Sequence, residues 1–374
     1  ETNVQEYNLY KKIYVNAMLS IDTLKAVLHT DTITQELLQQ FSTNDPTLLF
    51  AKSFTLNLFK NIGPDLNELI TELEDGVKHY QTAVEYGYNE EYDSRTIVGD
   101  DYTNVNEKHY GNNNVKGPDA SHGTHVSGII AADRKNDIGI KGIADNVKIM
   151  PVRAVPDGDE RDKDIANAII YAVDNGAKII NMSFGKAYSP QKEVVDKAVK
   201  YAEQKGVLLI HAAGNEGEDI DKENNFPTRF YKDGNEAKNW LEIGASAWGD
   251  NDAFVASFSN YGKKSVDLFA PGVDIYSTQP NSEYESEDGT SFASPATAGV
   301  AALLMSYFPD FTALEIKDIL KKSTRKFDNL QIQKPGGKGN VKFSELSNTG
   351  GLVNAYEAVK LAQSLKNQMK KTNN

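Results

Sequence analysis

The chain has 374 residues, of which 39% are hydrophobic and none is cysteine, and it carries 40 basic against 53 acidic side chains. This length allows a large buried core, in one big domain or two modest ones. The formal charge of -13 argues against a nucleic-acid partner, because binding to phosphates needs clustered cations. The lack of cysteine excludes disulfides, a thiolate zinc site and a cysteine nucleophile. Serine, threonine, histidine and carboxylates remain for any chemistry.

No part of the sequence indicates a membrane segment. There is no run of about 18 apolar residues that could span a bilayer. The polar start, ETNVQEYNLY, has no apolar signal core. We therefore expect no membrane span, and any targeting segment has been removed or was never present.

Residues 1 to about 88 are predicted to be helical. Asp45-Pro46 opens a helix with a cap and a proline in the first turn, and Gly63-Pro64 closes it. Apolar residues then recur at helical spacing until Gly87, a C-terminal stop. They are Leu66, Leu69, Ile70, Leu73, Val77, Tyr80 and Val84. Such a stripe is typical of a packed helical subdomain, and the alternative is a partner-binding or regulatory hairpin.

From about residue 96 the pattern changes to strands alternating with helices. Four near-continuous apolar runs are predicted to be strands buried on both faces: NVKIMPVRAV, AKIINMSF, GVLLIHAA and WLEIGAS. Between them lie the helical patterns KDIANAIIYAVDNG and PQKEVVDKAVKYAEQKG. This order predicts an α/β fold, a mostly parallel sheet with helices on both faces, in addition to the N-terminal helical layer. Active sites in such sheets lie at the carboxyl ends of the strands.

Three segments at strand or helix junctions contain residues that can carry chemistry. SHGTHVSGIIAA begins at residue 121 and places His122 and His125 at the start of a helix. HAAGNEG, from residue 211, takes a buried strand into the turn Gly214-Asn215. DGTSFASPATAGVAALL, from residue 288, opens a helix near Ser291. Each segment alone has a plain structural explanation, such as a helix cap for Ser291, but their occurrence together in this order is hard to explain as coincidence.

These segments resemble the histidine, oxyanion and serine signatures of the subtilisin-like serine proteases, or subtilases. The resemblance covers roughly residues 93 to 325. It implies that His122 is the general base, that Ser291 is the nucleophile and that Asn215 is the side-chain donor of an oxyanion hole. The chemistry suits these residue types, because a serine hydroxyl becomes a good nucleophile only when a neighbouring imidazole removes its proton.

The same resemblance extends to the substrate site and to the domain plan. NMSFG resembles the segment that borders the substrate pocket, so Ser183, Phe184 and Gly185, with Gly214, are expected to bind an extended peptide. His125 is assigned to packing, and no metal site is expected because the histidine pair lacks the glutamate of a metalloprotease motif. The domain plan is a helical insertion over residues 1–88, a catalytic domain over 89–350, and a C-terminal helix with a frayed tail over 351–374.

The chain departs from the family pattern at the third catalytic residue. Subtilases need an aspartate at the end of an apolar strand before the histidine segment. Asp93 follows the polar YNEEY, while Asp100 and Asp101 follow TIVG, which resembles the next strand of the fold. We therefore expect the first strand and its aspartate in an upstream fragment preceding Glu1, and no carboxylate of residues 1–374 to orient His122.

Two functions from different classes follow. One is a serine endopeptidase acting on extended peptides or proteins, and the other is a catalytically impaired scaffold that keeps a peptide-binding cleft. Intact His122, Asn215 and Ser291 favour the endopeptidase, and an esterase using the same groups has no feature in its favour. The endopeptidase requires no cofactor, although the surplus of carboxylates permits a structural calcium site without locating it. Its expected location is extracellular or in the bacterial cell envelope.

Overall fold

The computed structural model describes residues 2–61, 66–87, 89, 91–156, 158, 160–249 and 252–372. It divides into two compact units, one made of Glu1–Ile97 with Pro156–Asp159 and the other of Val98–Val155 with Glu160–Asn374. None of the helices in the described ranges combines the length and the apolar character that crossing a bilayer requires. Each unit has its own apolar clusters, and the division predicted at residues 88 and 350 stays a prediction.

The first unit is helical, as the sequence predicts. Its helices are α1 (Thr2–Leu28), α2 (Gln35–Gln40), α3 (Pro46–Asn61) and α4 (Leu66–Thr82), followed by a π-helical turn (Ala83–Gly87) and α5 (Arg95–Val98). The Asp45 carboxylate accepts hydrogen bonds from the backbone N–H groups of Thr47 and Leu48, which confirms the predicted start of α3. The predicted stop at Gly63-Pro64 lies outside the described residues. Leu24 is fully buried, in a cluster with Ile33, Leu38, Ala51 and Phe59.

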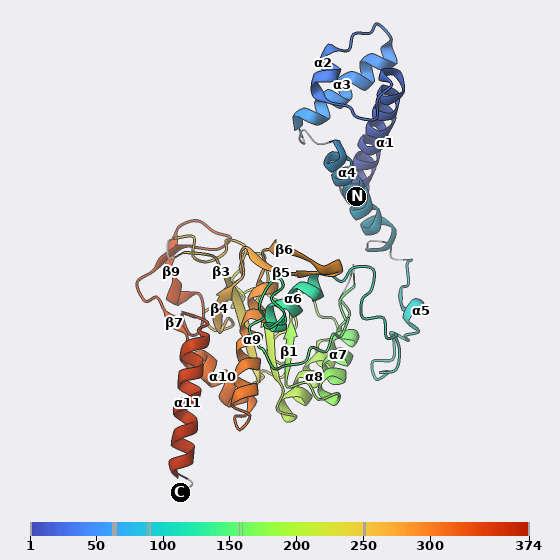
Figure 1. Cartoon of the computed structure of the whole chain (residues 1–374). Helices are drawn as coiled ribbons and strands as arrows, with labels where there is room; N and C mark the ends of the chain where they lie inside the picture. The colour runs from blue at the N-terminus through green and yellow to red at the C-terminus, as the bar shows by residue number, and fades with distance from the viewer. Residues whose placement is uncertain are drawn as a thin grey trace. The chain divides into compact units, whose positions relative to one another are not determined.

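The second unit contains a six-stranded sheet in the order β1-β2-β3-β4-β10-β7. Figure 1 labels four of these strands, β1, β3, β4 and β7. The first five of these strands run parallel to their neighbours and β7 is antiparallel to β10. The strands are β1 (Ile179–Met182), β2 (Leu208–Ala212), β3 (Trp240–Ser246), β4 (Leu268–Pro271), β7 (Arg325–Lys326) and β10 (Gly351–Leu352). The α/β class and the predicted strands β1, β2 and β3 are therefore confirmed.

Helices cover both faces of this sheet. Successive residues of a strand point to opposite faces, so each strand contributes side chains to both layers of helices. Leu208 and Ile210 of β2 lie in an apolar cluster with residues of α9, α10 and α11, whereas Leu209 lies in a cluster with residues of α7 and α8. The helices of this unit are α6 (Ser121–Ala131), α7 (Asp162–Asp174), α8 (Lys192–Gln204), α9 (Thr290–Tyr307), α10 (Ala313–Lys322) and α11 (Ala355–Thr372). Two hairpins complete it, β5 (Ile275–Gln279) with β6 (Glu283–Glu287) and β8 (Gln331–Gln333) with β9 (Asn340–Lys342).

Two predicted strands are wrong. Residues 96–98 of TIVG lie in the short helix α5, and NVKIMPVRAV, residues 146–155, forms no strand. The second error has a physical cause, because a strand needs a neighbour to satisfy its backbone groups and this segment has no paired strand within the described residues. Its apolar side chains are correspondingly exposed, with Ile149 42%, Met150 39%, Val152 36% and Val155 39% accessible.

Because the two units have separate apolar clusters, we expect Leu24→Ala to weaken the helical unit selectively. Replacing a fully buried leucine by alanine costs about 2–5 kcal/mol through lost burial and a residual cavity. Hydrogen exchange followed by mass spectrometry should accelerate in α1 to α4 and stay unchanged in β2 and β3. The matched control is Leu241→Ala, a fully buried leucine of β3. It should accelerate exchange in the sheet instead, and loss of protection in both units from Leu24→Ala alone would contradict the prediction.

Candidate active site

The two histidines of the first segment have different environments on α6. His125 is fully buried, its ring lies 4.4 Å from that of Phe292, and its Nε2 lies 3.2 Å from the Glu285 carbonyl oxygen. That environment fits the packing role predicted for it. His122 is exposed at the start of the helix, and its ring centre lies 5.7 Å from that of Phe292. Since Phe292 follows Ser291, α6 brings His122 close to the start of α9.

Asn215 lies in the turn after β2, and its side chain is oriented by Thr290. Its Oδ1 accepts hydrogen bonds from both the backbone N–H and the hydroxyl of Thr290, each at 2.9 Å. Its exposed Nδ2 group donates to no protein acceptor within the described part of the chain. The turn requires glycine at position 214, where φ is +102° and an added Cβ would come within 2.3 Å of Asn260 Nδ2. The amide hydrogens of Asn215 are therefore available to a ligand.

Ser291 is the second residue of α9, one position after Thr290. The helix is capped at Gly289 without a side-chain hydrogen bond, so Ser291 does not serve as its cap. Its hydroxyl donates to the Ser183 carbonyl at 3.3 Å, while the Ser183 hydroxyl donates to the Ser291 carbonyl at 2.7 Å. These two bonds join the start of α9 to the segment after β1. The hydroxyl is hydrogen-bonded to Ser183 rather than to His122.

Ser183, Phe184 and Gly185 follow the end of β1. The Phe184 carbonyl accepts a hydrogen bond from His211 Nε2 at 2.7 Å. A Cβ on Gly185 would lie 2.4 Å from Asn225 Oδ1, so this glycine permits the close approach of Asn225. Asn225 in turn donates to the Ala213 carbonyl at 2.8 Å. It therefore connects the segment after β1 with the segment after β2, a role for which the sequence contains no signal.

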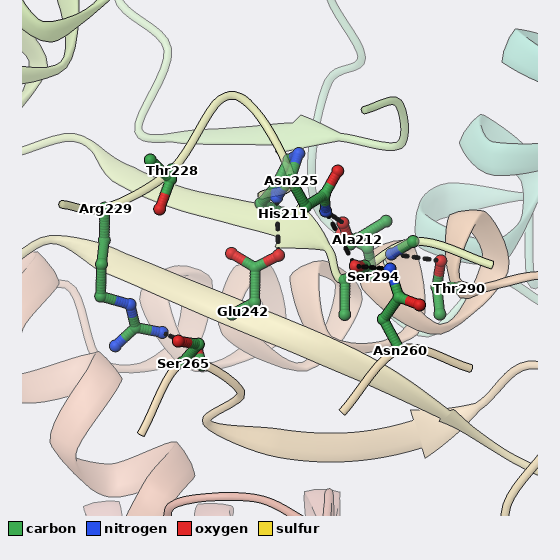
Figure 2. A network of polar contacts seen from close by, with 12 residues as sticks. His211, Ala212, Asn225, Thr228, Arg229, Glu242, Asn260, Ser265, Thr290 and Ser294 are labelled. Carbon is green, nitrogen blue, oxygen red and sulfur yellow. Dashed lines mark hydrogen bonds and ion pairs between the residues drawn. The ribbon is translucent and has the colours of Figure 1, made fainter. Parts of the chain in front are cut away.

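A second group missed by the sequence lies beneath this edge, in the buried network of Figure 2. His211 Nδ1 lies 2.8 Å from Glu242 Oε1, and Figure 2 marks this contact. Trp240 Nε1 donates to the other oxygen of Glu242 at 2.7 Å. The Glu242 carboxylate and the Phe184 carbonyl thus face the two nitrogens of one imidazole. His211 thereby fixes the Phe184 carbonyl relative to β2 and β3. In the sequence it stands inside an apolar strand, where a histidine is easily taken for a packing residue.

The three aspartates considered from the sequence as partners of His122 bond to other groups. Asp93 Oδ1 accepts from the Arg95 N–H, Asp100 is ion-paired with Lys163, and Asp101 accepts from the Thr103 hydroxyl. The absence of a triad acid from residues 1–374 stays a prediction.

The surroundings of His122 favour its neutral form. Although one side of the residue is exposed, the protein partly desolvates the ring, and this burial lowers the pKa of His122 below its ordinary value of about 6.5. Glu287 raises the pKa, the neighbouring His125 lowers it, and Asp119 raises it, but these charges do not outweigh the burial. The imidazole is therefore held in the form that can accept a proton.

Comparisons with known proteins identify the family of this chain. The sequence profile of the Subtilase family (peptidase S8) matches residues 64–346. The chain belongs to the subtilase family. A relative in this family, the Thermophilic serine proteinase of Bacillus sp. (strain AK1), is 41% identical over 226 residues, which make up 60% of this chain and 50% of that protein.

Further subtilases extend the comparison. The Cell wall-associated protease of Bacillus subtilis (strain 168) is 39% identical over 222 residues, 59% of this chain and 23% of that protein. A protease structure from Pseudoalteromonas arctica matches with a TM-score of 0.52 and 30% identity, over 64% of this chain and 70% of that chain. The chain spans half the length, or less, of these two curated subtilases.

Metal binding gains no support from the site. Among the residues that the structure describes, no group of three or more His, Cys, Asp or Glu side chains could hold a metal ion. The structural calcium site permitted by the composition stays an expectation.

The charges around His122 make its titration predictable. Burial disfavours the imidazolium, so we expect an NMR titration of the folded chain to give His122 a pKa below about 6.5. Glu287→Gln removes a negative neighbour that favours the imidazolium and should lower this pKa further. A pKa above about 6.5 in residues 1–374 would contradict the prediction and would indicate a carboxylate in contact with the ring.

Proposed function

We propose that this subtilase is a serine endopeptidase. Ser291 attacks the substrate carbonyl carbon, His122 takes the hydroxyl proton and returns it to the leaving amine, and Asn215 donates to the carbonyl oxygen as it becomes negative. These are the roles that the serine protease mechanism of subtilisin itself assigns to such groups, and they require no cofactor. The proposal excludes nucleic acid as a partner because of the net charge of -13.

The observation that carries the proposal is the start of α9. Thr290, Ser291 and Phe292 are consecutive, and each contacts a different segment of the site: Thr290 bonds to Asn215, Ser291 to Ser183, and Phe292 lies against the His122 ring. One turn of helix thus gathers the candidate nucleophile, base and oxyanion donor. The hydrogen bond between His122 and Ser291 is expected to form on substrate binding, since catalytic hydrogen bonds are often long or misaligned without substrate.

We infer that the substrate is an extended peptide segment. Ser183, Phe184 and Gly185 lie beside the nucleophile, and an extended peptide can add to such an edge through main-chain hydrogen bonds. Gly214 precedes Asn215 in the turn and is partly exposed, so we include it in the proposed peptide site. Hydrolysis of a casein-type protein would support the endopeptidase, whereas cleavage of a simple ester alone would favour an esterase.

We infer further that the acid orienting His122 is supplied by a segment outside residues 1–374. Within the described residues β1 pairs with β2 alone, so its other edge is open. The apolar residues 149, 150, 152 and 155, which precede β1 in the sequence, are exposed, as expected of a strand that lacks its partner. A strand from an upstream fragment, with an aspartate at its end, would pair at this open edge and cover these apolar residues.

The alternative is the catalytically impaired scaffold. An unoriented histidine costs such a site about 10⁴-fold in rate, while the oxyanion hole and substrate binding still act. Residues 1–374 alone would then bind peptides and hydrolyse them slowly. We further propose an extracellular or cell-envelope location, supported by the similarity to a cell wall-associated protease.

The direct test is labelling with a serine-directed fluorophosphonate, mapped by mass spectrometry. We expect one modified residue, Ser291, because only a serine activated by a base and an oxyanion hole reacts rapidly. Ser291→Ala should abolish the label. Ser286→Ala provides the matched control, since Ser286 is exposed on the nearby strand β6 and has no proposed role. Labelling at several exposed serines, or none, would exclude an activated nucleophile in this chain.

The proposed oxyanion role gives a quantitative expectation for Asn215→Ala. The variant should fold normally, because Asn215 is exposed. Its maximal rate should fall on the order of 10²–10³-fold, the magnitude measured for the corresponding donor of subtilisin, with KM nearly unchanged. Steady-state kinetics on a peptide substrate separate the two parameters. A raised KM with an unaltered kcat would show that Asn215 binds the ground state instead.

A further inference from the structure

Asn260 makes an unusually complete set of hydrogen bonds to the loop that carries Asn215. It is 1% exposed, in the connection between β3 and β4. Its Nδ2 donates to the Ala213 carbonyl at 2.9 Å and to Glu216 Oε2 at 2.6 Å. Its Oδ1 accepts from the backbone N–H groups of Glu216 at 3.2 Å and Glu218 at 2.7 Å. An amide side chain has two donor hydrogens and two acceptor lone pairs, so all four are used.

These bonds lie on both sides of Asn215 in the sequence without touching its side chain. Ala213 and Gly214 precede it, and the backbone N–H of Asn260 also donates to the Gly214 carbonyl, at 2.9 Å. Glu216 and Glu218 follow it. The contact is tight, since Gly214 has no room for a Cβ next to Asn260 Nδ2. The backbone of the loop is therefore held by Asn260, while the side-chain amide of Asn215 is held separately by Thr290; Figure 2 shows both of these holding residues.

We propose that Asn260 is a positioning residue for Asn215. This inference rests on the proposed oxyanion role of Asn215. A donor to a developing oxyanion acts only if it is already in place, and a displacement of about 1 Å can cost about 10²-fold in rate. Asn260 fixes the Cα of Asn215 from both directions, and Thr290 then fixes the rotation of the side chain. The two restraints together determine where the Nδ2 hydrogens point.

The chemistry of position 260 requires an amide. A carboxylate of the same shape keeps the acceptor for the Glu216 and Glu218 N–H groups, but it has no donor for the Ala213 carbonyl. It also faces the Glu216 carboxylate, so Asn260→Asp introduces charge repulsion where a hydrogen bond was. Adding Glu216→Gln removes that repulsion and supplies a donor. The double variant Asn260→Asp with Glu216→Gln should therefore regain part of the lost rate.

The decisive experiment is a double-mutant cycle on the complete chain. It compares the rates of fluorophosphonate labelling of wild type, Asn260→Ala, Asn215→Ala and the double variant, because this reaction also passes through an oxygen that becomes negative. Asn260→Ala should slow labelling about 10-fold or more in the wild-type background. In the Asn215→Ala background the same change should cost less than about 2-fold, since the group being positioned is gone. Equal losses in both backgrounds would overturn the proposal.

The matched control is Asn239→Ala. Asn239 is also 1% exposed, and its Nδ2 donates to the Val207 carbonyl at the start of β2, the end of the strand remote from Asn215. Both variants remove a buried amide and should lower the melting temperature. Only Asn260→Ala should slow labelling. A comparable slowing by Asn239→Ala would show that lost stability, rather than lost positioning, causes the effect.

A second measurement tests positioning independently of catalysis. In the 15N–1H NMR spectrum, the side-chain amide of Asn215 is assigned by its loss in Asn215→Ala. Asn260→Ala should shift or broaden this signal, and Asn239→Ala should leave it in place. An unchanged Asn215 signal in Asn260→Ala overturns the positioning role even if labelling is slow. If wild type is not labelled while the signal responds as expected, the proposed activity fails and the positioning of Asn215 stands.

Discussion

The candidate site depends on the pair of hydrogen bonds from Thr290 to Asn215 Oδ1. They join the turn after β2 to the start of α9, two elements separated by 75 positions in the sequence. Both bonds use the oxygen of the amide, so the nitrogen stays available to a ligand. The start of the same helix is bonded to Ser183 and packs against His122. If α9 moved relative to the sheet, the donor, the nucleophile and the peptide-binding edge would lose their alignment together.

Buried polar groups of the sheet hold the elements around this junction. His211 and Glu242 connect β2 with β3 and reach the Phe184 carbonyl of the substrate edge. At the same residue of β3, the Glu242 backbone N–H donates to the buried Asp267 carboxylate, which is ion-paired with Arg229. Removing one member of such a pair leaves an uncompensated charge in the interior, which is costly. The strands are thus held in register, and the loops that follow their carboxyl ends are held in position with them.

The sequence predicts the parts of this structure that depend on local patterns. Apolar runs located β1, β2 and β3, Asp45-Pro46 located the start of α3, and the three signatures located His122, Asn215 and Ser291. It failed where the outcome depends on distant partners. Residues 146–155 have strand composition but form none, because strand formation needs a neighbour. Asn225, Asn260 and His211 were missed because their contacts join residues 12 to 47 positions apart, and no local pattern marks an asparagine that closes such a bond.

The side of the site that contains Asn215 and the side that contains His122 therefore differ in how many contacts within this chain hold them. The oxyanion half is determined by bonds among residues 181–294: Asn260 holds the backbone of its loop, Thr290 holds its amide, and Ser183 holds the start of α9. The base half rests on packing against Phe292, while the aspartates at positions 93, 100 and 101 bond to other groups. A base oriented by packing alone is less restricted in direction than a donor whose side chain accepts two hydrogen bonds and whose backbone is held as well. Under the proposed mechanism, the orientation of His122 should limit the rate of this chain, and the proposed upstream segment would act on proton transfer rather than on the oxyanion.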